Sequence, residues 1–131
     1  AVSNFDGDGF YNDTADQQAK HLSTTGKRVQ VIDINSLFAN ISDKAEHVDI
    51  CKLDAEGSEY RILSDPRFLP VPKQISVEFH EHCHKDLHDK YFDACMDNLL
   101  KHYVAVRHER TQAHGAGCNW WDSLFVRRDL A

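Results

Sequence analysis

Short apolar runs, separated by polar and helix-like segments, dominate the middle of the chain. Apolar residues fill most of 48–53, which predicts a buried strand that ends abruptly at two carboxylates. Isoleucine and valine alternate with polar residues over 74–79, which predicts a second core strand. Between them, 58–63 has the apolar spacing of a short helix, with Ser58 expected as its N-cap. Strand, helix and strand in this order predict two neighbouring parallel strands.

The second half of the chain is expected to complete an α/β sheet with flanking helices. Apolar residues recur at helical spacing from 86 to 102, which indicates a helix packed on the sheet. Alternation over 103–110 and 120–128 predicts two strands, and the short loop between them indicates an antiparallel pair at a sheet edge. The adjacent Trp120 and Trp121 should face opposite sides of their strand.

The first third of the chain carries weaker signals. Aspartate and glycine alternate over 6–9, which predicts a hairpin or loop; a calcium loop is disfavoured because Phe10 stands at its fifth position. Residues 13–27 are polar and are expected to form a surface loop. A strand is predicted over 28–34, followed by a short helix that begins at Asp33.

Composition narrows the class of protein. A chain of 131 residues with 41% hydrophobic and 27% charged residues suits one globular domain, expected to span 1–131. The net charge of −6 argues against nucleic acid as a partner. No apolar run approaches the roughly 20 residues that span a bilayer, so no membrane partner is expected. The four cysteines form no CxxC pair, which favours a reduced, cytoplasmic protein without a structural zinc cluster.

Acidic residues and a histidine follow the two predicted core strands. Asp54 and Glu56 come directly after the first strand, and Glu78 and His80 end the second. Ligands of open α/β sheets bind beyond the carboxyl ends of the strands, so these four side chains should meet at one rim. Such a cluster can bind a divalent metal or act as a general base on a hydroxyl. The alternative interpretation is a purely structural one, in which a capped helix lies beside two surface carboxylates that neither bind nor catalyse.

The histidine-rich turn offers a competing hypothesis. His80, His82 and His84 alternate, and His88 lies one helical turn beyond His84, a spacing that can bind zinc. A strand, such a turn and a helix are similar to metallo-β-lactamase-like hydrolases, but His84 and Lys85 stand where that family has aspartate and histidine. A polar turn of histidines without metal is the simpler interpretation.

One motif carries a family resemblance. Lys52-Leu53-Asp54-Ala55-Glu56-Gly57-Ser58-Glu59 resembles the central motif of the FkbM family of S-adenosylmethionine-dependent methyltransferases. Flanking matches extend the resemblance over most of the chain: Ile62-Leu63, Ile75-Ser76-Val77-Glu78-Phe79-His80 and Leu124-Phe125-Val126-Arg127-Arg128. The glycine-rich loop that begins this family's cofactor site has no counterpart in the sequence. The resemblance therefore covers the C-terminal portion of an FkbM-like domain.

The resemblance implies a fold and a function. The fold is a partial Rossmann-like, class I methyltransferase α/β mixed sheet with flanking helices and a C-terminal antiparallel strand pair. The implied activity is S-adenosylmethionine-dependent O-methylation of a small molecule, at a hydroxyl of a sugar or secondary metabolite. It implies catalytic roles for Asp54, Glu56, Glu78 and His80, and cofactor contacts at Asp54 and Gly57. Related sugar methyltransferases sometimes use magnesium, for which Asp54, Glu78 and His80 are the candidate ligands.

The resemblance also predicts an exposed strand edge. In the full family fold a further strand would lie beside 48–53, so that edge is open here unless something covers it. Three coverings are expected as alternatives: the N-terminal segments Phe5–Tyr11 or Val29–Ile34, a second copy of the chain in a homo-oligomer, or the rest of a longer enzyme. The methyltransferase activity would need its cofactor-binding half from a longer chain or partner. A non-catalytic remnant that binds a small ligand or partner at the same rim is the alternative function.

Overall fold

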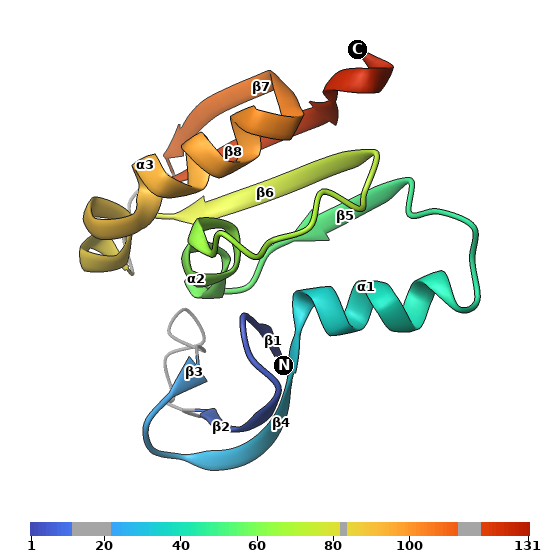
Figure 1. The fold of residues 1–131 in the computed structure, drawn as a ribbon. Helices are drawn as coiled ribbons and strands as arrows, with labels where there is room; N and C mark the ends of the chain where they lie inside the picture. Colours follow the sequence, from blue (N-terminus) through green and yellow to red (C-terminus); the bar gives the residue numbers. More distant parts are fainter. Residues whose placement is uncertain (12–21, 82–83, 113–118) are drawn as a thin grey trace.

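Two sheets organise the part of the protein that the structure describes. The computed structural model describes residues 1–11, 22–81, 84–112 and 119–131 (Figure 1). The N-terminal sheet has the strand order β1-β4-β2-β3, built from Val2–Ser3 (β1), Gly7–Tyr11 (β2), Leu22–Ser23 (β3) and Lys27–Asp33 (β4). The larger C-terminal sheet has the order β5-β6-β8-β7, built from Ile50–Leu53 (β5), Gln74–His80 (β6), Asn119–Arg127 (β8) and Tyr103–Gln112 (β7).

The helices join and cover these strands. They comprise α1 (Ile34–Ser42), α2 (Ser58–Ser64) and α3 (Lys85–His102), with a short 3₁₀ turn at Arg128–Leu130. α2 connects β5 to β6, which pair in parallel, whereas β8 pairs antiparallel with both β6 and β7. The expected mixed sheet with a C-terminal antiparallel pair is therefore confirmed. The Rossmann-like assignment itself stays a prediction.

The main core lies between this sheet and the helices α2 and α3, which cover one of its faces (Figure 1). Alternate residues of β6 point into it, and Phe79 packs 5.6 Å from Tyr60 of α2, measured between ring centroids. From α3, Cys95 and Leu99 are fully buried, and the Cys95 thiol donates to the Tyr60 carbonyl. The predicted packing of this helix on the sheet is confirmed.

Neither N-terminal segment pairs with the edge of β5, so the first of the three alternatives is wrong. Both edges of β4 are already hydrogen-bonded, to β1 on one side and to β2 on the other. β2 likewise pairs with β3 and β4, and neither β2 nor β4 belongs to the sheet that contains β5. β5 is consequently an edge strand in the described part of the chain, and Ile50 is 62% exposed.

Local predictions need smaller corrections. Ser58 is the first residue of α2, not its cap; Gly57 occupies the N-cap position without a side-chain cap bond. The 6–9 segment is mostly strand β2 instead of a turn. The helix expected to begin at Asp33 begins at Ile34, and Asp33 is its N-cap, accepting from the N–H of Asn35. Most of the predicted 13–27 loop, together with His82, Cys83 and Cys118, lies outside the described residues.

Candidate functional site

The parallel pairing of β5 and β6 brings their C-terminal ends together. Leu53 pairs with Val77, so Asp54, just beyond the end of β5, lies beside Glu78 of β6. The Nε2 atom of His80, at the end of β6, lies 3.7 Å from Asp54 Oδ1 and 3.9 Å from Glu78 Oε1.

Glu56 completes the group, with Oε2 also 3.7 Å from His80 Nε2. All four side chains expected at one rim are therefore neighbours. We call Asp54, Glu56, Glu78 and His80 the acidic rim. Their roles in binding and catalysis stay predictions.

A fourth carboxylate, Glu59, lies beneath the rim and is fully buried. Its Oε1 accepts from the backbone N–H of His80 at 3.1 Å and lies 3.0 Å from Nδ1 of the same histidine. Its Oε2 accepts from the backbone N–H of Gly57 at 2.8 Å. Sequence reasoning included Glu59 in the motif but gave it no role. The available signal was its place in the first turn of α2, the helix that directly follows the end of β5.

Competing effects set the protonation of His80. Burial lowers the pKa of His80, but its hydrogen bond to Glu59 and the charges of Glu59, Glu56 and Glu78 outweigh burial and raise this pKa to about 8. Burial and the nearby charge of Asp54 raise the pKa of Glu78 above its usual value. His80 therefore keeps its second ring proton to a higher pH than a free imidazole does.

The turn that carries Glu56 has an unusual backbone. Glu56 has φ 48° and Gly57 has φ 96°, so two consecutive residues are left-handed. A left-handed non-glycine residue is uncommon and persists where the surroundings enforce it. The hydrogen bond from Gly57 to Glu59 is one such constraint. This conformation aims the Glu56 carboxylate at His80.

The rim has the donor set of a metal site. One oxygen each from Asp54 and Glu78, and one nitrogen from His80, lie within 4.8 Å of one another. Two carboxylates and an imidazole suit first-row divalent ions such as Mn²⁺, and suit Mg²⁺ less well because it prefers oxygen ligands. The residues present thus fit a divalent cation.

The zinc-hydrolase hypothesis gains no such support from the described residues. The His88 Nδ1 atom lies 3.0 Å from the Tyr60 hydroxyl, and the His84 ring packs closely on Gly57. Neither histidine belongs to the three-residue donor group at the rim. His82 is outside the described ranges.

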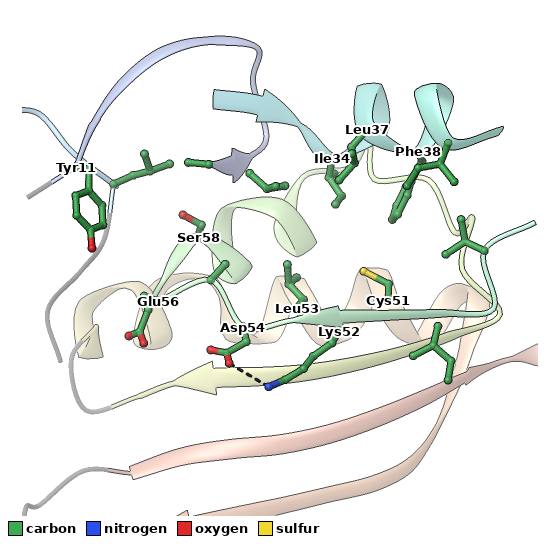
Figure 2. Close-up of a pocket in the computed structure, with 17 residues that line it drawn as sticks. Tyr11, Ile34, Leu37, Phe38, Cys51, Lys52, Leu53, Asp54, Glu56 and Ser58 are labelled. Atoms are coloured by element: carbon green, nitrogen blue, oxygen red, sulfur yellow. Dashed lines mark hydrogen bonds and ion pairs between the residues drawn. The ribbon is translucent and has the colours of Figure 1, made fainter. Parts of the chain in front are cut away.

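A pocket of about 520 Å³ opens between α1 and β5 beside the rim. Figure 2 shows Leu37 and Phe38 of α1 on its apolar side and the carboxylates of Asp54 and Glu56 toward its other end. The Lys52 ammonium lies 3.1 Å from an Asp54 oxygen (Figure 2). An apolar cavity with a few convergent polar groups is the usual form of a small-molecule site.

Trp120 and Trp121 lie on β8 beside the end of β6, and their side chains point to opposite faces of the sheet, as predicted. Trp121 packs on the core side, 4.6 Å from the His108 ring between centroids, and its indole N–H donates to Glu81. Trp120 pairs with His80 across the strands, and its N–H donates to Asp122. The charge of Asp122 also contributes to the raised pKa of Glu78, an effect that sequence reasoning missed.

Comparison with known families now adds to this geometry. A family model described as the methyltransferase FkbM domain matches residues 2–106. The chain belongs to the FkbM methyltransferase domain family. The resemblance carried by residues 52–59 is thereby confirmed, and an FkbM domain implies a methyltransferase acting on a small molecule.

Neither the curated proteins nor the solved structures include a significant match to the chain. Within the described ranges, none of the helices has the length and apolar character needed to cross a bilayer.

Proposed function

We propose that this FkbM domain takes part in S-adenosylmethionine-dependent methylation of a hydroxyl group on a sugar or secondary metabolite, in the cytoplasm. One observation carries the proposal: the acidic rim gathers three carboxylates around one imidazole at the strand ends of a methyltransferase-family domain. The adjoining pocket supplies space for a small molecule beside those groups.

Methyl transfer to a hydroxyl requires few catalytic groups from the protein. The sulfonium methyl group of the cofactor is already activated, so the site must align the acceptor oxygen and manage its proton. His80 is the proposed general base, because its Nε2 faces the rim and the surrounding carboxylates stabilise the imidazolium that forms. With a pKa of about 8, the imidazole acts as a base in a growing fraction of molecules as the pH rises toward that value. Asp54, Glu56 and Glu78 orient the acceptor molecule by accepting from its neighbouring hydroxyl groups, because the reacting hydroxyl donates its one proton to His80.

A divalent cation is the proposed alternative to His80 as the group that activates the hydroxyl. Asp54, Glu78 and Nε2 of His80 would hold it, as their common donor set allows. When bound, the ion acts as a Lewis acid that lowers the pKa of a coordinated hydroxyl. Glu56 then remains as the carboxylate that accepts the hydroxyl proton.

The cofactor contacts are proposed at Asp54 and Gly57, the turn of the family motif. We infer that residues 1–131 act as the C-terminal portion of an FkbM-like domain, because the sequence has no counterpart of the glycine-rich loop. The cofactor-binding half would then come from a longer chain or a partner. Activity of the lone chain is correspondingly expected to be low.

Titration calorimetry with S-adenosylmethionine tests the proposal. Micromolar binding by the chain, weakened in Asp54→Asn but retained in Asp8→Asn, would support it; Asp8 is an exposed carboxylate of the N-terminal sheet. Transfer of a labelled methyl group to hydroxylated acceptors would identify the reaction. Polyol binding at the rim without S-adenosylmethionine binding, in the lone chain and in a longer enzyme that contains it, would instead indicate a non-catalytic binding module.

A further inference from the structure

The hydrogen bonds around Glu59 decide which nitrogen of His80 carries a proton. Oε2 accepts from the Gly57 backbone and Oε1 from the His80 backbone, and a backbone N–H can only donate. Both oxygens of Glu59 are therefore acceptors, one for the Gly57 N–H and one for the His80 N–H. His80 Nδ1 lies 3.0 Å from the same Oε1, so a lone pair on Nδ1 would face an acceptor at hydrogen-bond distance. A carboxylate at Glu59 has no proton to donate, so Nδ1 carries the hydrogen.

This assignment sets the direction of the other ring nitrogen. With the proton on Nδ1, the neutral imidazole has its lone pair on Nε2, which faces Asp54, Glu56 and Glu78 at 3.7–3.9 Å. We propose that Glu59 is a positioning residue that fixes His80 as the Nδ1–H tautomer and presents the Nε2 lone pair to the acidic rim. The inference deepens the proposed function and rests on it for its consequence in catalysis.

The placement of Glu59 makes the constraint a rigid one. The residue is fully buried and sits on α2, while its partners lie on the β5–α2 turn and at the end of β6. One side chain thus ties Gly57 to His80, and His80 is itself only 5% exposed. Ring rotation would break the bond to Nδ1 and leave a buried acceptor short of one donor.

The Glu59–His80 pair would affect a cation at the rim in the way that carboxylate–histidine pairs affect metals in other proteins. A carboxylate behind a ligating imidazole fixes the tautomer and raises the basicity of the outward nitrogen. Glu59 would play this part for His80, without touching the ion or the acceptor. The proposed function assigned Glu59 no role, and nothing in the family match specifies one.

Nitrogen-15 NMR of histidine-labelled wild-type protein tests the assignment without any variant that alters Glu59. At alkaline pH, where the imidazole is neutral, His80 should show a protonated Nδ1 and an unprotonated Nε2. Loss of one signal set in His80→Gln identifies the residue. A neutral His80 with its proton on Nε2, or an even mixture of tautomers, overturns the proposal.

Glu59→Gln provides the second arm. An amide offers one acceptor and one donor, so in either orientation it places an N–H against a backbone N–H. We expect loss of the fixed tautomer and a Mn²⁺ affinity lowered about 10–100-fold, measured by electron paramagnetic resonance. Glu109→Gln, at an exposed glutamate paired with Arg107, is the matched control and should change neither quantity.

The two arms separate the inference from the function beneath it. Wild-type protein that has the Nδ1–H tautomer but binds no Mn²⁺ supports the positioning role and removes the metal from the proposed function. Wild-type protein that binds Mn²⁺ with His80 in the opposite tautomer overturns the positioning role alone. Unchanged Mn²⁺ affinity in folded Glu59→Gln also overturns it.

Discussion

Gly57 lies so close to the ring of His84 that a side chain at Gly57 would collide with it. A Cβ at Gly57 would stand 2.7 Å from Cδ2 and 2.9 Å from Cγ of that ring, and Gly57 also has φ 96°. Glycine is thus required twice, by the left-handed backbone and by the packing. Both requirements apply to the turn that directs the Glu56 carboxylate toward His80.

We therefore predict that Gly57→Ala destabilises the protein through two separable effects. The left-handed backbone costs about 1–3 kcal/mol, and the collision with His84 adds a similar amount. Gly7→Ala is the matched control, because Gly7 has φ 145° but no neighbouring atom within 4 Å of where its Cβ would stand. Urea unfolding should show that Gly57→Ala costs about 1–3 kcal/mol more than the control. Equal losses would mean that His84 yields freely.

His80 makes a pH-dependent contribution to stability. Its pKa is raised from 6.5 to about 8 in the folded state, so the folded protein binds this proton more tightly than the unfolded chain does. The stabilisation is fully present below about pH 6.5 and is lost as the pH rises through about 8. A shift of this size corresponds to about 2 kcal/mol.

The test compares the pH dependence of unfolding free energy in wild type and His80→Gln, with chelator present. The difference between the two should shrink by about 2 kcal/mol between about pH 6 and pH 9. His47→Gln serves as the control, since His47 is an exposed residue paired with Asp49 at the surface. A difference that stays constant with pH would show that the carboxylates do not hold the His80 proton.

The local elements around the rim followed from the sequence because each had a strong local signal. Alternating β-branched residues defined β6, and the helical apolar spacing defined α3 within one residue at its start. The meeting of Asp54 with Glu78 needed only that two neighbouring strands be parallel. Local pattern and one topological rule were sufficient for this part of the site.

The features that the sequence did not settle, namely whether the N-terminal strands pair with β5, the role of Glu59 and the N-cap of α2, depend on contacts that no local pattern encodes. Whether the N-terminal strands would reach β5 depended on which edges of β4 were already paired. Glu59 looks like any acidic residue in the first turn of a helix, and its burial appears only when Gly57 and His80 converge on it. Ser58 was favoured as a cap by residue type, whereas the left-handed Gly57 takes that position.

Divalent metal should stabilise the folded protein through the rim. A cation that binds only the native state adds about 2.7 kcal/mol to the unfolding free energy when its free concentration is about a hundred times its dissociation constant. We expect Mn²⁺ to raise the melting temperature of wild type, and Asp54→Asn combined with Glu78→Gln to abolish the rise. Asp49→Asn, at an exposed carboxylate paired with Lys73, should retain it. A rise that survives in the double variant would place the ion elsewhere.

The open edge of β5 is expected to mediate self-association. An unpaired apolar edge strand offers a row of free backbone groups to a second chain, and Ile50 on β5 is 62% exposed. Sedimentation velocity should show dimers or larger species in wild type and monomers in Ile50→Lys, because a lysine at the edge opposes strand pairing. Val106→Lys is the matched control, since Val106 is 61% exposed on β7 at the opposite edge. Dissociation by Val106→Lys instead would assign the interface to β7, and a wild type that is monomeric at all concentrations would remove the prediction.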